Sequence, residues 1–536
     1  MASPAAAQSS PPAAPVVDAP SGSMRGSAQG NVNAFKGIPY AVPPTGGMRW
    51  RPPAPMKKWA GVRAATDFGP ACVQPQAKTP TSIYSPSAPL PVSEDCLTLN
   101  IWAPKNAKNA PVFLWIHGGA LSGGSSRETM YDGQRMADRA GVIVVSINYR
   151  LGVLGWFAHP ALSAESPQKV SGNYGLLDQI AALSWVRYNI AAFGGDKNNV
   201  TIAGESAGGL SVMYLLESPL ARGLFQKAIA ESAYMVSMPD LKKGIYGAPS
   251  SEALGQLVAG GLQTPDLAGL RGMDAQTITD AAAKLGFAPF GAVDGLVLPQ
   301  QMTTTFDEGK QAPVPLLAGF NQGEIRSLMM LAPKPPATVA DYEKAIRDRY
   351  GDLADAFLAL YPAADYKDSI IATTRDALYG WTAERLVRKQ TAIGQPAFLY
   401  LFDHGYPAAD AAGLHAHHAS ELPYVFGTID ATPPLWPKIP DAAGERALSD
   451  AMLDYWASFA RNGKPGAAMA PVWPAYGKTA SYMYFAATPQ ARTTMMPGMY
   501  ALNEAVMCRK AAAGIGWNWN VGLASPKLPG KTGTCQ

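Results

Sequence analysis

Residues 198–210, Asn-Asn-Val-Thr-Ile-Ala-Gly-Glu-Ser-Ala-Gly-Gly-Leu, constrain the fold of this chain more than any other stretch. The β-branched run at 200–202 predicts a strand that enters a turn at Gly204. The turn, Gly-Glu-Ser-Ala-Gly, has the form G-x-S-x-G, which places a serine on a sharp strand-to-helix elbow. We expect this elbow to expose the Ser206 hydroxyl and to direct the positive end of the following helix toward it.

The G-x-S-x-G sequence alone is weak evidence, because glycine, serine and alanine are common in this chain. It becomes specific where a Gly-rich loop precedes it and an acid and a histidine follow in that order. The continuous apolar runs 112–116 and 142–147 predict a mostly parallel sheet buried on both faces. His-Gly-Gly-Ala at 117–120 follows the first run directly. An ordinary Gly-rich turn is one interpretation, but the position favours a loop whose backbone N–H groups converge as an oxyanion hole.

The chain resembles the type-B carboxylesterases of the α/β-hydrolase fold, a family that includes the cholinesterases. The matching stretches are Phe-Lys-Gly-Ile-Pro-Tyr-Ala (35–41), Ser-Glu-Asp-Cys-Leu-Thr-Leu-Asn-Ile (93–101), Asn-Tyr-Arg-Leu-Gly (148–152), Gly-Asn-Tyr-Gly-Leu-Leu-Asp-Gln (172–179), Asn-Ile-Ala-Ala-Phe-Gly-Gly-Asp (189–196) and Gly-Glu-Ser-Ala-Gly-Gly (204–209). Stretches 157–167 and 171–174 resemble secreted bacterial members, including fumonisin-type esterases. The resemblance implies a central, mostly parallel sheet flanked by helices, with helical cap insertions.

The resemblance also implies the groups that would stabilise an oxyanion. By alignment with the family's motifs, these are the backbone N–H groups of Gly119, Ala120 and Ala207. The family usually carries a third glycine where this chain has Ala120. Alanine keeps the N–H donor, but its methyl group is expected to narrow the space beside the scissile carbonyl.

The general base should follow both the serine and the acid in chain order, which leaves the histidines after Ser206: His404, His415, His417 and His418. The cluster of three could instead hold a metal, but no acidic partner pattern supports a zinc site, so we expect no metal and no other cofactor. The family places its base three residues before the glutamate of Glu-Leu-Pro-Tyr-Val-Phe-Gly, which implies His418.

Several acidic residues between Ser206 and His418 could orient the base. Residues 315–324 predict a strand ending in a Gly-containing loop, and an acid at a strand end can reach a histidine on the next loop. This stretch resembles the family's loop whose glutamate completes a triad, which implies Glu324. Asp294, in Val-Asp-Gly, is the alternative acid.

Four cysteines, Cys72, Cys96, Cys508 and Cys535, allow three pairings. Adjacent pairing closes two modest loops and suits an oxidising compartment, which predicts a secreted or periplasmic protein. Four free thiols in a cytosolic enzyme are the alternative. The family resemblance implies the Cys72–Cys96 bridge, whereas the pairing of Cys508 with Cys535 depends on proximity alone.

Composition excludes several kinds of partner. The formal net charge is +4 and the basic residues are scattered, which argues against nucleic-acid binding. The sequence contains no run of about 18 apolar residues, so it predicts no membrane-spanning helix. The Ala/Ser/Pro-rich segment 1–14 lacks the basic and apolar regions of a signal peptide, and we interpret it as a disordered mature N-terminus with an added start Met.

The sequence therefore predicts one domain over 15–536, with cap insertions near 233–310 and 326–415. The expected activity is hydrolysis of small to medium organic esters through a Ser-His-Glu triad and an acyl-enzyme intermediate, in a bacterial detoxifying or scavenging role. A cholinesterase-like binding protein with weak catalysis is one alternative, although Ser206, Glu324 and His418 are all present. Amidase or lipase activity is another.

Overall fold

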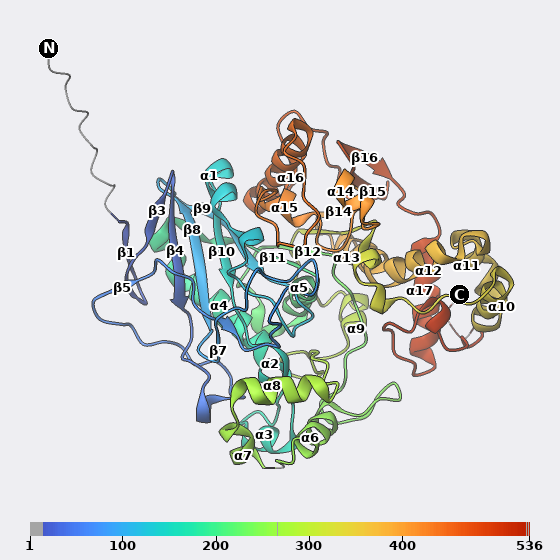
Figure 1. The fold of residues 1–536 in the computed structure, drawn as a ribbon, viewed down its shortest axis with the longest axis horizontal. Helices are drawn as coiled ribbons and strands as arrows, with labels where there is room; N and C mark the ends of the chain where they lie inside the picture. The colour runs from blue at the N-terminus through green and yellow to red at the C-terminus, as the bar shows by residue number, and fades with distance from the viewer. Residues whose placement is uncertain (1–13, 265, 532, 534, 536) are drawn as a thin grey trace.

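The computed structural model describes residues 14–264, 266–531, 533 and 535. The disorder predicted for 1–14 falls, except for Ala14, outside the described residues. The centre of the molecule is an 11-stranded sheet in the order β16-β15-β14-β13-β12-β11-β9-β10-β8-β4-β3 (Figure 1). Neighbouring strands from β15 to β10 in this order are parallel, and the pairings outside them are antiparallel. The predicted mostly parallel sheet is therefore confirmed.

The strands of the large sheet are β3 (Ser27–Gln29), β4 (Val32–Pro39), β8 (Thr98–Pro104), β9 (Ala110–Ile116), β10 (Ile143–Ile147), β11 (Gly195–Glu205), β12 (Lys227–Glu231), β13 (Leu316–Asn321), β14 (Ala397–Phe402), β15 (Ser481–Phe485) and β16 (Pro489–Thr493). Two small sheets contain β1 (Val16–Ala19), β2 (Gly22–Arg25) and β5 (Val62–Ala64), and β6 (Ala71–Cys72) and β7 (Val92–Ser93).

The helices are α1 (Gln134–Ala140), α2 (Gly152–Trp156), α3 (Pro160–Glu165), α4 (Tyr174–Asn189), α5 (Ala207–Glu217), α6 (Ser251–Gly261), α7 (Leu267–Gly272), α8 (Ala275–Lys284), α9 (Met302–Asp307), α10 (Val339–Tyr350), α11 (Ala354–Leu360), α12 (Tyr366–Arg375), α13 (Trp381–Ala392), α14 (Pro407–Ala411), α15 (Leu422–Phe426), α16 (Ala443–Asn462) and α17 (Met499–Ala512). Short 3₁₀ turns η5 (Glu324–Ser327) and η6 (Met329–Leu331) follow β13, and a π-helical turn, η9 (Asp376–Gly380), joins α12 to α13.

Strand β9 explains why the sheet is covered on both faces. All seven of its residues are buried, and successive side chains point to opposite faces. Val112, Leu114 and Ile116 join the core cluster that contains α4 and α5. Phe113 and Trp115 join the cluster that contains α15 and α16. Full burial of such side chains contributes about 1.5–3 kcal/mol each, so neither helix layer is dispensable.

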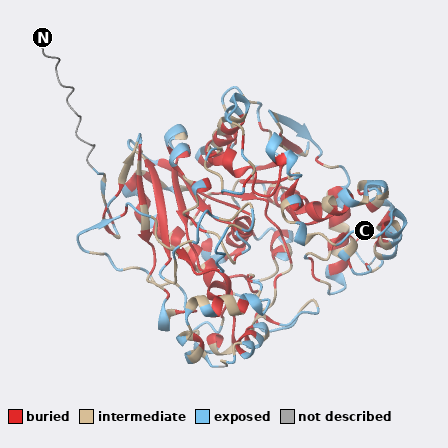
Figure 2. Cartoon of the chain, viewed as in Figure 1, coloured by how far each residue is buried: buried red, intermediate tan, exposed pale blue. Residues whose placement is uncertain are grey.

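The segments between the later strands are largely helical. Segment 233–310 contains α6 to α9, and segment 326–415 contains α10 to α14 together with β14, a strand of the large sheet. Figure 1 shows α6, α7 and α8 grouped at one side of the sheet, and α10, α11 and α12 grouped with α17 at another. Buried residues concentrate on the central strands, whereas the outward faces of these helix groups are exposed (Figure 2).

Both cysteine pairs lie at disulfide distance, as adjacent pairing predicts. The S–S distance is 2.02 Å for Cys72–Cys96 and 2.01 Å for Cys508–Cys535. The first bridge closes a loop between β6 and β8, and the second joins α17 to the C-terminal segment.

Candidate active site

Ser206 lies on the elbow that the sequence predicts. Strand β11 ends at Glu205 and α5 begins at Ala207, so that Ser206 alone joins them, with φ 56° and ψ −119°. This conformation is strained for a residue with a side chain. A Cβ atom on Gly204 would lie 2.5 Å from the Gly208 carbonyl carbon, which leaves no room for a side chain there. The elbow therefore requires its small residues for steric reasons.

The loop after β9 packs against this elbow. A Cβ atom on Gly118 would lie 2.8 Å from the Glu205 carbonyl oxygen, so only glycine allows the contact. Gly119 and Ala120 follow with φ 105° and 54°. Within the described part of the chain, neither of their N–H groups donates to a protein acceptor. The N–H of Ala207 opens α5, where first-turn amides have no partner in the helix. Among the described residues, the N–H groups of Gly119 and Ala120 are therefore free to serve as the expected oxyanion donors, and the position of Ala207 at the start of α5 is compatible with the same role.

Glu324 is fully buried at the start of η5, in the loop that follows β13. Its Oε1 atom accepts hydrogen bonds from the Ser232 hydroxyl at 2.6 Å and from the Asn321 backbone N–H at 2.8 Å. Its Oε2 atom bonds to Nδ1 of His418. No sequence motif points to Ser232, whose only cue is its place at the end of a buried strand next to β13.

His418 lies in the segment between α14 and α15, and the fold brings it to both Glu324 and the elbow. While Nδ1 bonds to Glu324, Nε2 lies 3.0 Å from Oε1 of Glu205. No hydrogen bond joins the Ser206 hydroxyl to His418 among the described residues. The histidine segment is held against β13 by Asn321, whose side-chain amide donates to the His417 carbonyl at 2.8 Å.

The two neighbouring histidines have other partners. His415 lies between Asp410, 2.7 Å from its Nδ1, and Asp403, 2.9 Å from its Nε2, and these carboxylates raise its pKa. The buried ring of His417 packs on Trp436 with centroids 4.7 Å apart, and burial lowers its pKa to about 4. Neither imidazole bonds to Glu324 among the described contacts.

Asp294 and His404, the other candidates, are bonded elsewhere. Oδ1 of Asp294 accepts the backbone N–H groups of 296, 297 and 298 at 2.8–3.1 Å, and Oδ2 accepts from Asn173 at 3.0 Å, which closes a turn. Nε2 of His404 lies 2.8 Å from Oε2 of Glu445. These contacts give Asp294 and His404 structural roles in other parts of the fold.

Buried carboxylates surround the imidazole of His418. Burial alone would lower its pKa, but Glu205 and Glu324 outweigh that effect and raise the pKa to about 9. Burial raises the pKa of Glu205 to about 7. Burial, together with Glu205 and Glu324, raises the pKa of Glu421 to about 8. Burial therefore favours the neutral form of these carboxyl groups, whereas their negative charge favours the imidazolium of His418.

Ser206 and His418 open into a cavity of about 560 Å³, within the usual size of a small-molecule site. Gly119 and Ala120 also line it. The cavity wall is mainly aromatic and apolar, and it includes the carboxylates of Glu128 and Glu205 and residues of segment 74–90. Its aromatic and apolar side chains include Met130, Tyr131, Tyr234, Leu328, Met330, Leu331, Tyr379 and Trp519. Segment 74–90 could not be assigned to the site from sequence, because its Pro- and Ser-rich pattern indicates only a surface loop.

Sequence comparison identifies the family. Residues 13–501 match the model of the carboxylesterase family. The chain is 37% identical to the fumonisin B1 esterase of Sphingopyxis macrogoltabida, over 87% of this chain and 85% of that protein. It is also 37% identical to the para-nitrobenzyl esterase of Bacillus subtilis (strain 168), over 85% and 91%.

Solved structures agree with this assignment. A PNB esterase structure superimposes with a TM-score of 0.75 at 33% identity, covering 89% of this chain and 97% of that one. A Geobacillus stearothermophilus carboxylesterase gives a TM-score of 0.71 at 31% identity, covering 91% and 99%. In the described part of the chain, no helix has the length and apolar character needed to span a bilayer. The chain has the α/β-hydrolase fold, belongs to the carboxylesterase family and is a carboxylic ester hydrolase.

Proposed function

We propose that Ser206, His418 and Glu324 form the catalytic triad of this esterase. The supporting observation is the bond between His418 Nδ1 and the buried Glu324, beside the cavity into which Ser206 opens. A triad needs one imidazole nitrogen on a carboxylate and the other free to take the serine proton. For that step Nε2 of His418 has to turn from Glu205 to the Ser206 hydroxyl.

Hydrolysis then proceeds in two stages. His418 removes the proton of Ser206 as the hydroxyl oxygen attacks the ester carbonyl, and Glu324 stabilises the imidazolium. The N–H groups of Gly119, Ala120 and Ala207 hold the tetrahedral oxyanion, with each donor contributing about 3–4 kcal/mol in comparable sites. The imidazolium protonates the departing alcohol, and water, activated by the same imidazole, hydrolyses the acyl-enzyme.

The proposed substrates are small to medium organic esters. A cavity of about 560 Å³ with aromatic walls supports this size and polarity. The similarity to the fumonisin B1 esterase of Sphingopyxis macrogoltabida supports a bacterial detoxifying or scavenging role. Two cysteine pairs at disulfide distance support a secreted or periplasmic location. We also propose one domain over 15–536, with caps near 233–310 and 326–415.

A turnover assay tests the proposal and separates it from the alternatives. The chain should hydrolyse p-nitrophenyl acetate, seen as a burst or a steady release of p-nitrophenol, and an organophosphate should abolish this release. A panel of esters that vary the acyl and alcohol parts, with a matched p-nitroanilide and a triglyceride emulsion, separates esterase from amidase and lipase activity. Absence of turnover on every member of the panel would favour a binding protein.

A further inference from the structure

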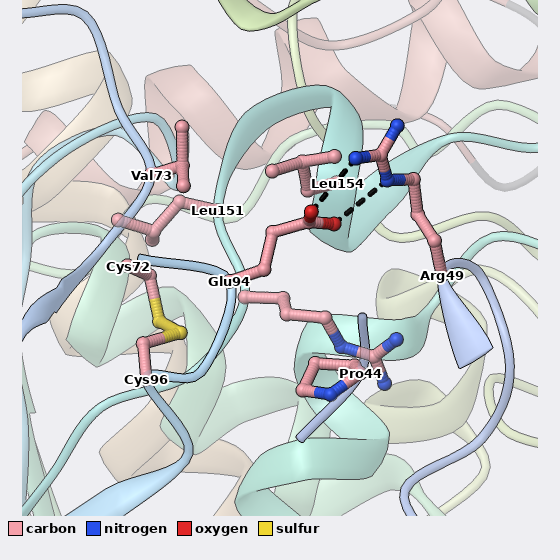
Figure 3. Close-up of a pocket in the computed structure, with 9 residues that line it drawn as sticks. Pro44, Arg49, Cys72, Val73, Glu94, Cys96, Leu151 and Leu154 are labelled. Atoms are coloured by element: carbon pink, nitrogen blue, oxygen red, sulfur yellow. Dashed lines mark hydrogen bonds and ion pairs between the residues drawn. A yellow bond between two sulfur atoms is a disulfide. The ribbon is translucent and has the colours of Figure 1, made fainter. Parts of the chain in front are cut away.

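The loop closed by Cys72–Cys96 is anchored firmly at its base. Figure 3 shows the disulfide beside the ion pair between Arg49 and Glu94. Two guanidinium nitrogens of Arg49 each lie 2.7 Å from a different carboxylate oxygen of Glu94, and both side chains are largely buried. Such bidentate pairs have a fixed orientation. A covalent bond and a bidentate ion pair therefore hold the base of the loop.

The outer part of this loop, residues 74–90, forms one wall of the cavity. Among the described residues, the side chain of Tyr84 links this segment to the proposed catalytic groups. The phenolic oxygen lies 2.7 Å from the Ser327 hydroxyl and 3.0 Å from the backbone carbonyl of His418. The ring lies edge-on to the His418 imidazole at 6.5 Å and to Trp436 at 5.9 Å, measured between centroids.

The direction of these hydrogen bonds follows from the available protons. A carbonyl oxygen can only accept, so the single proton of the Tyr84 hydroxyl goes to His418. The Ser327 hydroxyl must then donate to Tyr84. Ser327 ends the 3₁₀ turn that begins with Glu324. The chain of bonds from Ser327 through Tyr84 to His418 therefore connects the segment of the acid to the segment of the base.

The peptide that accepts this bond precedes a strained residue. Ala419 has φ 64°, in the left-handed region that disfavours residues with a side chain. The carbonyl held by Tyr84 belongs to the peptide unit between His418 and Ala419. Rotation of that peptide unit changes ψ of His418 and φ of Ala419 together. It would therefore relieve the backbone strain at Ala419 and at the same time displace the His418 side chain. The Tyr84 hydrogen bond opposes this rotation.

We propose that Tyr84 is a positioning residue that holds the backbone of His418 in place, so that the imidazole keeps its bond to Glu324 beside the cavity, and that it ties the cavity wall 74–90 to the proposed triad. The inference depends on the proposed role of His418 as general base. Tyr84 contacts the backbone of the base and takes no proton from the substrate. Its loss should therefore slow the chemical step more than it weakens substrate binding.

Tyr84→Phe tests this, with Tyr342→Phe as the matched control. Tyr342, on α10, also donates its hydroxyl to a backbone carbonyl, that of Tyr361 at 3.2 Å, in a different part of the fold. In Tyr84→Phe, kcat for p-nitrophenyl acetate should fall about 10-fold, with KM within about twofold of wild type, since one hydrogen bond and a small misplacement are lost. Tyr342→Phe should retain the wild-type kcat. A wild-type kcat in Tyr84→Phe would overturn the proposal.

Ser327→Ala and the double variant test the direction of the bonds. Ser327→Ala leaves the bond from Tyr84 to His418 intact, so its kcat should fall less than that of Tyr84→Phe. The double variant should be no slower than Tyr84→Phe, because the effect of Ser327 passes through Tyr84. A double variant whose losses multiply in full would contradict this arrangement.

Hydrogen–deuterium exchange provides a readout that needs no turnover. Tyr84→Phe should increase exchange at 74–90 and 415–420, whereas Tyr342→Phe should leave both segments as in wild type. Unchanged exchange at 415–420 in Tyr84→Phe would overturn the positioning role, and so would faster exchange with an unchanged kcat. If wild type hydrolyses no ester, the proposed function fails, while exchange at 415–420 still decides whether Tyr84 holds the histidine segment.

Discussion

Nε2 of His418 lies 3.0 Å from Oε1 of Glu205, the residue immediately before Ser206. Because Nδ1 bonds to Glu324, two buried carboxylates share one imidazole, and together they raise its pKa to about 9 against the effect of burial. An unperturbed histidine has a pKa of about 6.5. A general base acts in its neutral form, so kcat/KM should rise with pH and reach half its maximum well above 6.5. A pH–rate profile from about 5 to about 10 measures this midpoint.

Glu205→Gln isolates the contribution of that carboxylate. The substitution keeps the size of the side chain and removes its negative charge. Without that charge, the protonated imidazole of His418 is stabilised less relative to the neutral form. The midpoint of the pH–rate profile should therefore move down toward 6.5. Glu445→Gln is a control, because it removes the carboxylate paired with His404 outside the cavity and should leave the midpoint in place. The same midpoint in wild type and Glu205→Gln would show that Glu205 does not act on His418 in solution.

Ser206→Ala should abolish ester hydrolysis and covalent labelling by an organophosphate. The proposed nucleophile is lost, while the methyl side chain fits the elbow and should leave folding intact. Mass spectrometry of labelled wild-type peptides identifies the modified residue, and circular dichroism checks folding. Labelling of a different serine would exclude Ser206 as the nucleophile.

His418→Ala should reduce the rate by at least about a thousandfold, the scale of single deletions from serine triads. His417→Ala and His415→Ala should retain most activity, because these rings bond to a backbone carbonyl and to two aspartates outside the proposed triad. Steady-state kinetics of the three variants decides between the histidines. An inactive His417→Ala beside an active His418→Ala would refute the assignment of the base.

Glu324→Gln should reduce kcat by about 10³–10⁴-fold, because a neutral amide neither stabilises the imidazolium nor fixes its tautomer. Asp294→Asn should keep most of the activity, since Asp294 closes a turn through backbone N–H groups. Comparing kcat of the two variants measures which acid serves His418. Near-normal activity in Glu324→Gln would transfer the role to another carboxylate.

The two disulfides should differ in their effect on activity. Removing either with paired Cys→Ser substitutions should lower the free energy of unfolding by about 3 kcal/mol under the chain-entropy model, because the cysteines lie 24 and 27 residues apart. Only the loss of Cys72–Cys96 should also reduce kcat/KM, since that bridge closes the loop that lines the cavity. Denaturant unfolding and ester kinetics test both statements, and free thiols found by non-reducing peptide mapping of wild type would contradict them.

Contiguous residues determined the parts of this protein that sequence could predict. The buried runs 112–116 and 142–147 are strands β9 and β10, because an apolar run of that length is stable only when both faces of a sheet are covered. The elbow around Ser206 was equally predictable from its motif, and at Gly204 the steric need for glycine is local, because a Cβ atom there would meet Gly208. At Gly208 that need comes from the Ile116 carbonyl of β9, which only the fold brings close. Glu324 and His418 were identified from motif resemblance, and the fold brings them into contact.

Only the tertiary structure decided what surrounds those residues. The Glu205–His418 contact joins segments 213 positions apart (418 minus 205), and Tyr84 reaches a carbonyl 334 positions away. Ser232 bonds to Glu324 because β12 lies beside β13 in the sheet. The raised pKa of His418 depends on the distances to two carboxylates, whose effect outweighs that of burial, and no local sequence pattern encodes those distances. Sequence thus determined which chemical groups the chain carries, whereas packing decided which of them meet and how strongly they hold their protons.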